Sequence, residues 1–161
     1  MSDIFTSTVE SPIGPLTLLA RNGVLTNLTM QEHRHSSPTP PDAIVDDAWF
    51  KDVAEQLDRY FAGKLTTFDV EMDLRGTEFQ QRVWAQLREI PYGETISYGE
   101  LARRVGNANA SRAVGLANGR NPISIIVPCH RVIGADGSLT GYGGGLERKT
   151  WLLDHESARR Q

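Results

Sequence analysis

Cys129 is the single cysteine of the 161-residue chain and stands in the segment Pro128-Cys129-His130-Arg131. A lone cysteine is most often a small buried hydrophobic side chain, and that interpretation is the default. The neighbouring residues favour chemistry instead, because the positive character of His130 and Arg131 would stabilise a thiolate. The segment therefore indicates a nucleophilic thiol with a histidine beside it as a base.

His130 needs a route to the thiol and a partner that orients its ring. Side chains of adjacent residues on an extended chain point in opposite directions, so we expect His130 to act on Cys129 through a water molecule. A histidine used as a base commonly pairs with a carboxylate. Glu156, near the end of the last expected helix, is the candidate partner.

The region after the cysteine is dense in glycine, with six of the 15 glycines between Gly134 and Gly145. It ends in Gly141-Tyr142-Gly143-Gly144-Gly145, and no Gly-Lys-Ser or Gly-Lys-Thr follows, so it is not a phosphate-binding P-loop. We expect either a lid or backbone that approaches a ligand closely, with Tyr142 at its centre.

The net charge of −3 hides an asymmetry between the two halves. Residues 1–78 carry 6 basic and 13 acidic side chains, whereas residues 79–161 carry 11 and 7. Between Leu101 and Arg131 there are five arginines and no acidic residue. Such a patch is a plausible footprint for a polyanion, and a solvated helix face explains it equally well.

Two short helices lie within this basic region. Ser97 and Glu100 form the pattern of a capping box at the start of the first helix, and Gly106 ends it. A second helix is expected from Ser111 or Arg112 to Asn118. The pair has the outline of a helix-turn-helix, and a DNA-binding unit and an ordinary helical hairpin both fit it.

Other elements of the second half hold these features in place. Thr77 and Gln80 form the pattern of a capping box that begins a helix. We expect residues 123–127 to form a buried strand that leads directly to Cys129, and residues 132–133 to form a further short extended run. A last helix is expected from Leu146 to Glu156.

The first half is predicted to be a small β-rich unit with one helix. Strands at 16–20 and 24–30 flank Asn22-Gly23, a strong hairpin signal. A helix follows from about Asp46 until Gly63 ends it, and Leu65 to Met72 alternates weakly like a last strand.

Length and composition exclude several classes of protein. The chain suffices for one domain or two small ones, and we expect a division into residues 1–74 and 75–161 near Asp73-Leu74-Arg75-Gly76. One cysteine excludes an intramolecular disulfide and a Cys-rich zinc site, and His33 and His35 form a chance polar pair in a surface loop. The longest apolar runs, such as residues 125–127, are too short for a membrane span, and no secretory signal is recognisable, so we expect a cytoplasmic protein.

Several motifs appear together in an order that resembles one family, the O6-alkylguanine-DNA alkyltransferases. The motifs that carry the resemblance are Pro128-Cys129-His130-Arg131-Val132-Ile133, Gly141-Tyr142-Gly143-Gly144-Gly145-Leu146, Ile90-Pro91-Tyr92-Gly93-Glu94, Ser97-Tyr98, Ser111-Arg112-Ala113-Val114-Gly115 and Gly119-Arg120-Asn121-Pro122. The match extends from about Gly76 to Glu156. It implies an α+β fold in which a small ribonuclease-H-like α/β domain precedes a mainly helical domain with a winged-helix-like helix-turn-helix.

The resemblance also implies an activity and catalytic residues. Members of the family flip an O6-alkylated guanine out of duplex DNA and transfer the alkyl group, irreversibly and without a cofactor, to their own cysteine, here Cys129. His130 would deprotonate Cys129 through water, Glu156 would orient the imidazole, and Asn121 would hold the adjoining turn. Tyr98 would donate a proton or hydrogen bond to the departing guanine. Whether O4-alkylthymine is also accepted stays open.

The resemblance assigns further residues to the base pocket and to DNA. Tyr142 and Gly143 would close the pocket, which Val132 and Asn118 also line. The second helix of the helix-turn-helix would enter the minor groove, where Arg112 fills the space left by the flipped base. The small side chains of this helix would permit close approach to the DNA backbone: Ser111, Ala113 and Gly115. We expect a protein that is monomeric in solution and able to cluster on DNA.

The sequence departs from the family pattern at one position, and three other functions compete with alkyl transfer. The position after Tyr142 is often serine in the family and is Gly143 here, which removes a hydroxyl contact to the substrate. A non-reactive alkyltransferase-like protein that binds damaged bases is the main alternative, and the presence of Cys129 argues against it. A cysteine hydrolase would leave Arg112 unexplained, and a plain transcription regulator would leave Cys129 and His130 unexplained.

Overall fold

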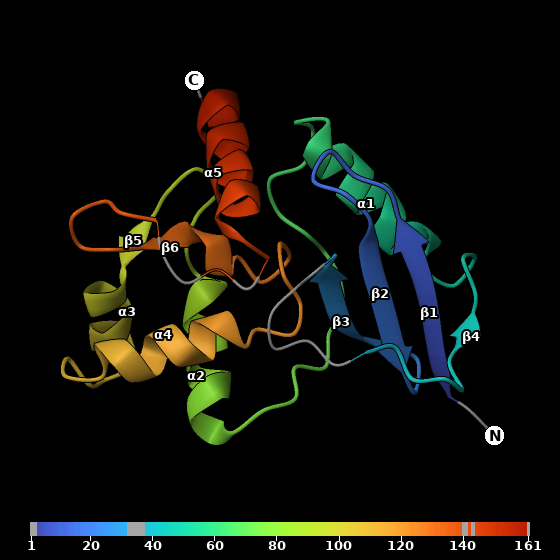
Figure 1. The fold of residues 1–161 in the computed structure, drawn as a ribbon, viewed down its shortest axis with the longest axis horizontal. Coiled ribbons are helices and arrows are strands. Elements are labelled where there is room, and N and C mark those ends of the chain that lie inside the picture. The colour runs from blue at the N-terminus through green and yellow to red at the C-terminus, as the bar shows by residue number, and fades with distance from the viewer. Residues whose placement is uncertain (1–2, 32–37, 140–141, 143, 161) are drawn as a thin grey trace.

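The computed structural model describes residues 3–31, 38–139, 142 and 144–160, which form two parts that pack side by side (Figure 1). A sheet with one helix makes up the N-terminal part, and a group of helices makes up the C-terminal part. His33 and His35, together with Gly141 and Gly143 of the glycine-rich segment, lie outside the described residues. Among the described residues, no helix is both long enough and apolar enough to cross a membrane.

The N-terminal sheet has the strand order β3-β2-β1-β4, formed by Ile4–Val9 (β1), Leu16–Arg21 (β2), Val24–Met30 (β3) and Ile44–Val45 (β4). Strand β2 pairs antiparallel with β1 and β3, whereas β4 runs parallel to β1. The predicted hairpin is confirmed: Asn22 and Gly23 both have positive φ, 53° and 81°, as a tight two-residue hairpin turn requires. Strands β1 and β4 were not predicted.

Helix α1 spans Lys51–Phe61 and packs against the sheet (Figure 1). It begins later than the expected Asp46, because the Asp46 carboxylate instead accepts a hydrogen bond from Trp49 N at 3.1 Å and forms a turn. The strand expected at 65–72 is wrong. The buried Gln56 amide takes over its backbone bonds, donating to Asp69 O at 2.9 Å and accepting from Asp69 N at 2.8 Å, and a single bridge joins Met72 to Leu25.

The C-terminal part contains the helices Glu78–Leu87 (α2), Tyr98–Arg104 (α3), Ser111–Gly119 (α4) and Leu146–Arg160 (α5), with a short parallel pair between Ile96–Ser97 (β5) and Val132–Ile133 (β6). The capping box at Thr77 and Gln80 is confirmed. The second box is half formed: Ser97 caps Glu100 N at 3.0 Å, but the Glu100 carboxylate pairs with Arg103 and Arg104.

The segment before Cys129 corrects a further expectation, since residues 123–127 are buried but form a turn instead of a strand. Asn121 stabilises this turn, donating to Val127 O at 2.8 Å and accepting from Ile123 N at 3.0 Å. At its start the segment bonds to the open edge of β3, through Leu28 N to Pro122 O at 2.9 Å and Ser124 N to Leu28 O at 3.1 Å. The sheet of the first part thereby holds the approach to the cysteine.

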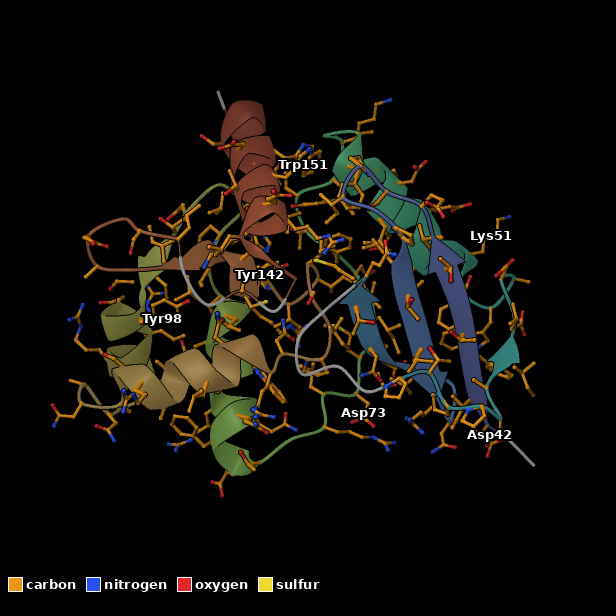
Figure 2. All side chains as sticks on the ribbon, viewed as in Figure 1. Asp42, Lys51, Asp73, Tyr98, Tyr142 and Trp151 are labelled. Carbon is orange, nitrogen blue, oxygen red and sulfur yellow. The ribbon has the colours of Figure 1, made fainter. Side chains whose placement is uncertain are left out.

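Side chains of α5 also join the two parts. Arg148 donates to three backbone carbonyls, those of Ile13 at 2.9 Å, Gln31 at 2.8 Å and Gly144 at 3.0 Å. Higher on the same helix, Trp151 stacks on His155, and His155 lies edge-on to Tyr60 of α1. Figure 2 shows Trp151 on the side of α5 that faces α1.

Candidate active site

Cys129 is the first residue of a single 3₁₀ turn, η1 (Cys129–Arg131), and its side chain is 4% exposed. Its backbone N–H donates to Val127 O at 2.8 Å, and its carbonyl accepts from the Asn118 amide at 3.3 Å. The sequence predicted that the cysteine stands at the end of an extended strand, and this prediction is wrong. A helical turn held by two buried amides, those of Asn118 and Asn121, fixes its position.

The electrostatics of Cys129 also differ from the expectation. Burial raises the pKa of the thiol, and the side chains of Asn121 and Lys149 oppose that rise without cancelling it. Arg131 is turned away, donating to Glu156 and, at 2.7 Å, to Ile90 O. The prediction that the sequence neighbours His130 and Arg131 would favour a thiolate is therefore wrong, and the resting thiol needs a base to remove its proton.

His130 and Glu156 form the expected pair in a fully buried setting. His130 Nε2 lies 2.7 Å from Glu156 Oε2, and the two side chains are 0% and 1% exposed. Burial lowers the pKa of His130, although the adjacent carboxylate works in the opposite direction. Burial alone would raise the pKa of Glu156, yet the hydrogen bonds and charges of His130 and Arg131 hold it well below its usual range.

These protonation states assign the two nitrogens of His130. Because Glu156 is ionised and accepts, Nε2 of the neutral imidazole carries the proton and donates it to Oε2. Nδ1 is then the basic nitrogen. It is buried and has no hydrogen-bond partner among the described residues. The ring is thus set up to accept a proton at Nδ1 while its other side is anchored.

Glu156 receives further hydrogen bonds that the sequence did not predict. Arg131 donates through Nε at 2.8 Å and Nη2 at 3.0 Å, and the hydroxyl of Tyr60 donates at 2.7 Å. Tyr60 belongs to α1 in the other half of the chain. The sequence offers one signal for it, a tyrosine among the apolar positions of an amphipathic helix, which does not identify its partner.

Lys149 is a second buried polar side chain of the site that the sequence did not predict. It is fully buried, donates to Val132 O at 2.6 Å and lies with its amine 5.9 Å from the centre of the Tyr98 ring. Burial lowers the pKa of Lys149 to about 8. Its spacing of three and seven residues from Leu152 and Glu156, on the buried stripe of α5, was an available signal.

Tyr98 connects this region to the two short helices. It is the first residue of α3 and is half-buried, and a Cβ added to Gly115 of α4 would meet its ring at 3.8 Å. Helix α4 buries Val114, Ala117 and Asn118 and exposes the residues at its N-terminal end: Ser111, Arg112 and Ala113. The expected helix pair is present, and three of the predicted DNA-contacting residues, Ser111, Arg112 and Ala113, are exposed, whereas Gly115 and Tyr98 are half-buried against each other.

Tyr142 lies between the two parts of the protein (Figure 2). Its side chain is 5% exposed, with the hydroxyl 3.9 Å from Met30 Sδ at the end of β3. Burial raises the pKa of Tyr142 well above its usual value, and Cys129 is near enough to raise it further. A Cβ on Gly144 would collide with Met30 and the Tyr142 ring, so any larger residue here would have to displace these side chains.

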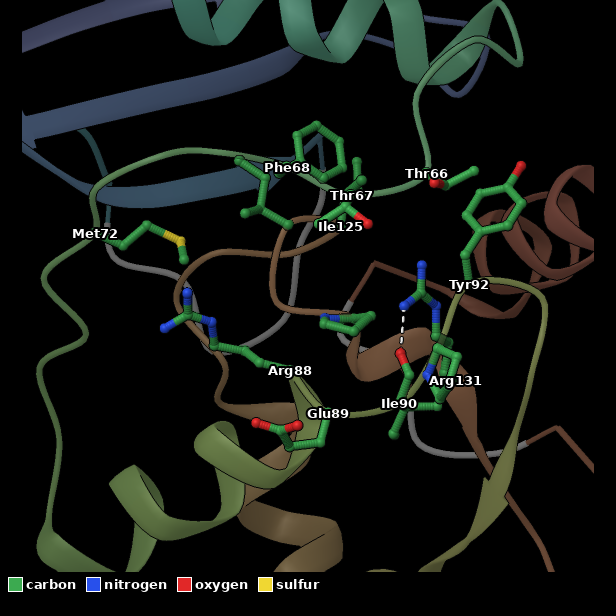
Figure 3. Close-up of a pocket in the computed structure, with 13 residues that line it drawn as sticks. Thr66, Thr67, Phe68, Met72, Arg88, Glu89, Ile90, Tyr92, Ile125 and Arg131 are labelled. Carbon is green, nitrogen blue, oxygen red and sulfur yellow. Dashed lines mark hydrogen bonds between the residues drawn. The ribbon is translucent and has the colours of Figure 1, made fainter.

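A cavity of about 220 Å³ lies beside Pro128 and Arg131, the residues on either side of Cys129-His130 (Figure 3). Its lining comes from both parts of the chain and includes Thr66, Arg88, Tyr92 and Arg131, but not Cys129. The cavity therefore adjoins the Arg131 side of the site and does not contain the thiol. Within the described ranges, no group of three or more histidine, cysteine, aspartate or glutamate side chains is arranged to hold a metal ion.

Two family models match the chain. The model for the 6-O-methylguanine DNA methyltransferase, ribonuclease-like domain, matches residues 4–74, and the model for the DNA binding domain of the same family matches residues 78–158. The two matches cover both halves of the chain.

Individual relatives and solved structures agree with the family models. The chain is 60% identical over 152 residues to a methylated-DNA–protein-cysteine methyltransferase of Mycobacterium tuberculosis, covering 94% of this chain and 92% of the relative. The protein of that name from Methanosarcina acetivorans is 51% identical over 149 residues, with coverages of 92% and 96%.

Among solved structures, the Mycobacterium tuberculosis OGT in complex with DNA superimposes with a TM-score of 0.91 at 59% identity, covering 96% of this chain and 94% of that one. The O6-methylguanine-DNA methyltransferase of the archaeon Pyrococcus kodakaraensis gives 0.69 at 26% identity, with coverages of 95% and 98%. The two-part architecture is therefore shared along nearly the whole chain.

Proposed function

The chain belongs to the 6-O-methylguanine DNA methyltransferase family, and on that premise we propose that Cys129 accepts the alkyl group of O6-alkylguanine in duplex DNA. Direct-reversal DNA repair, with a cysteine of the protein as acceptor, is the function that the chain shares with its methylated-DNA–protein-cysteine methyltransferase relatives. The observation that carries the residue assignment is the buried Cys129 turn beside His130, whose Nδ1 is basic and whose Nε2 is anchored on Glu156.

The reaction is a displacement at the alkyl carbon. The Cys129 thiol loses its proton to His130 Nδ1 through a water molecule, and the sulfur then forms a bond to the alkyl carbon. The bond from that carbon to guanine O6 breaks, and its electron pair stays on the base. A proton returns to the guanine, which leaves as the normal base. The thioether product has no route back to a thiol, so each molecule acts once.

The remaining pocket residues act on the base and on the cysteine turn. Tyr98 donates a hydrogen bond or proton to the departing guanine, and Asn121 holds the turn through its bonds to Val127 and Ile123. Val132 and Asn118 line the pocket, while Tyr142 and Gly143 close it. The position of Tyr142 beside Cys129 and Met30 supports its part of this assignment.

Helix α4 is proposed to enter the minor groove. Arg112 fills the space left by the flipped base, while Ser111, Ala113 and Gly115 allow close approach to the backbone. Exposure of the N-terminal residues of α4 supports this assignment, as does the existence of a DNA complex for the M. tuberculosis relative. We propose a monomer in solution that clusters on DNA.

The finer description of the fold belongs with this proposal. We infer a ribonuclease-H-like domain over residues 1–74 and a winged-helix-like DNA-binding domain over residues 75–161. The four-stranded sheet with α1, and the α3–α4 pair with the short β5–β6 ladder, support the two descriptions.

The experiment is intact-protein mass spectrometry after mixing the protein with duplex DNA that contains O6-methylguanine. One methyl group gained per molecule, confined to the peptide with Cys129, is expected. Unchanged mass with retained DNA binding would favour the non-reactive damage-binding alternative, against which Cys129 and the methyltransferase relatives argue.

A further inference from the structure

The hydroxyl of Tyr60 contacts the proposed catalytic carboxylate from the opposite half of the chain. It donates to Glu156 Oε2 at 2.7 Å, across 96 positions of sequence, and His130 Nε2 contacts the same oxygen at 2.7 Å. Both Tyr60 and Glu156 are at most 1% exposed. Helix α1, which has no part in the thiol turn or the DNA-contacting helices, thus supplies one of the donors that fix this oxygen.

Tyr60 is itself rigidly held and permanently a donor. Burial, together with the charge of Glu156, raises the pKa of Tyr60 far above its usual value, so the hydroxyl keeps its proton. Its ring packs against Phe61, Phe68 and His155 at centroid distances of 5.2, 5.4 and 5.3 Å. His155 Nε2 also lies 2.7 Å from the Tyr60 carbonyl oxygen. The hydroxyl therefore has one well-defined position, at the carboxylate.

We propose that Tyr60 is a positioning residue for the alkyl transfer, so that the N-terminal domain completes the Cys129–His130–Glu156 relay. This inference rests on the proposed function of the relay. Tyr60 acts through Glu156: by fixing Oε2, it fixes the direction in which His130 Nε2 donates, and so the orientation of the imidazole ring that carries the basic Nδ1.

The proposal predicts the sign of a pH effect. Among the described residues, Glu156 accepts hydrogen bonds from Tyr60 of α1, from His130 and Arg131 of η1, and from the Gly93 backbone N–H at 3.5 Å. Lys149 of α5 is a further charged group that acts on His130, and its charge lowers the pKa of the imidazole. Without the Tyr60 hydroxyl, Oε2 directs more of its negative charge to His130 and favours the imidazolium. The acid limb of the rate profile, where His130 becomes protonated, therefore moves to higher pH.

The test is Tyr60→Phe, which removes one oxygen and keeps the ring. The rate constant of methyl transfer from O6-methylguanine duplex DNA is measured against pH, with stability followed by urea unfolding. We expect the rate at neutral pH to fall about 10-fold, the scale of one hydrogen bond to a charged group. The matched control is Ser7→Ala, because the buried Ser7 hydroxyl donates to Asp47 at 2.6 Å within the same domain and away from the relay. It is expected to react at the wild-type rate.

A double-mutant cycle separates positioning from general destabilisation. In a Glu156→Gln background the Tyr60 hydroxyl has lost its charged partner, so Tyr60→Phe is expected to change the remaining rate less than 2-fold. An equal rate loss in both backgrounds, or a wild-type rate with an unmoved acid limb in Tyr60→Phe, would overturn the inference. If the double variant does not fold, the acid limb of the pH profile of Tyr60→Phe alone tests the inference. Failure of the wild-type protein to acquire a methyl group would refute the proposed function itself.

Discussion

Glu156→Gln tests whether the buried carboxylate is the ionic anchor of the site. Its two oxygens accept from His130 at 2.7 Å, from Tyr60 at 2.7 Å and from Arg131 at 2.8 and 3.0 Å. Glutamine keeps the shape but removes the charge, and its amide nitrogen has to face donors. Arg131, whose side chain is 9% exposed, is left without its counter-ion.

The structure sets the size of the expected effect. Removing one partner of a buried ion pair costs about 3–5 kcal/mol. For a chain of this length each kcal/mol lowers the melting temperature by about 2–4 °C, so the variant should melt roughly 6–20 °C below the wild type. Because typical native proteins have about 5–15 kcal/mol of stability, we expect the variant to remain folded at room temperature.

The sign of the pH dependence follows from the depressed pKa of Glu156. Its contribution to stability is fully present above the unfolded pKa of about 4.3 and is lost as the pH falls through the folded pKa. Glutamine has no such contribution to lose. The stability difference between the wild type and Glu156→Gln should therefore narrow below about pH 4.

Urea unfolding followed by tryptophan fluorescence, at several pH values between about 7 and 3, measures both quantities. Glu100→Gln is the matched control, because Glu100 also pairs with two arginines, Arg103 and Arg104, but on the surface. The urea concentration at its unfolding midpoint should equal that of the wild type. A cost for Glu156→Gln below about 1 kcal/mol, or a difference that does not narrow in acid, would refute the assignment of an ionised anchor.

Three further variants test the thiol and the proposed DNA contact of α4. Lys149→Met removes the buried charge that lowers the pKa of Cys129, so the pH midpoint of its reaction with iodoacetamide should move upward; an unmoved midpoint contradicts this role. Arg112→Ala should slow repair of O6-methylguanine in duplex DNA more than reaction with the free modified base, and equal slowing excludes a role in base flipping. Gly115→Ala adds a Cβ in ordinary contact with Tyr98 at 3.8 Å, so the free energy of unfolding should stay the same or rise by about 0.5–1 kcal/mol. The affinity for duplex DNA should fall in a binding titration, and an unchanged affinity would contradict a DNA contact at Gly115.

Features determined by local chemistry were predictable from the sequence. The Asn22-Gly23 hairpin depends on two residues that tolerate positive φ, and the start of α2 depends on Thr77 and Gln80 bonding to each other's backbone. The approach to Cys129 was not predictable in the same way. An apolar run fits a buried strand and a buried turn equally well. Here the turn is stabilised by the hydrogen bonds of the Asn121 side chain and by those to the edge of β3.

The charged groups of the site illustrate a second limit. Sequence adjacency suggested that Arg131 would act on Cys129, but η1 turns Arg131 towards Glu156, and Lys149 from α5 influences the thiol instead. The partnership of Tyr60 and Glu156 joins helices from the two halves of the chain. Such pairs depend on how whole elements dock, which no local pattern encodes.

The bonds between β3 and residues 122–124 also bear on the synthesis of the protein. A strand edge with unpaired backbone groups is a template for aggregation, and here the segment that leads to Cys129 covers part of that edge. Ser124, which covers the edge, follows Leu28 by about 96 positions. At a synthesis rate of about 5–20 residues per second, the β3 edge therefore stays uncovered for roughly 5–20 s after Leu28 is made. A nascent chain that stalls between the two halves would carry an uncovered strand. In the folded protein, the segment that leads to Cys129 therefore also shields part of the β3 edge from pairing with a strand of another chain.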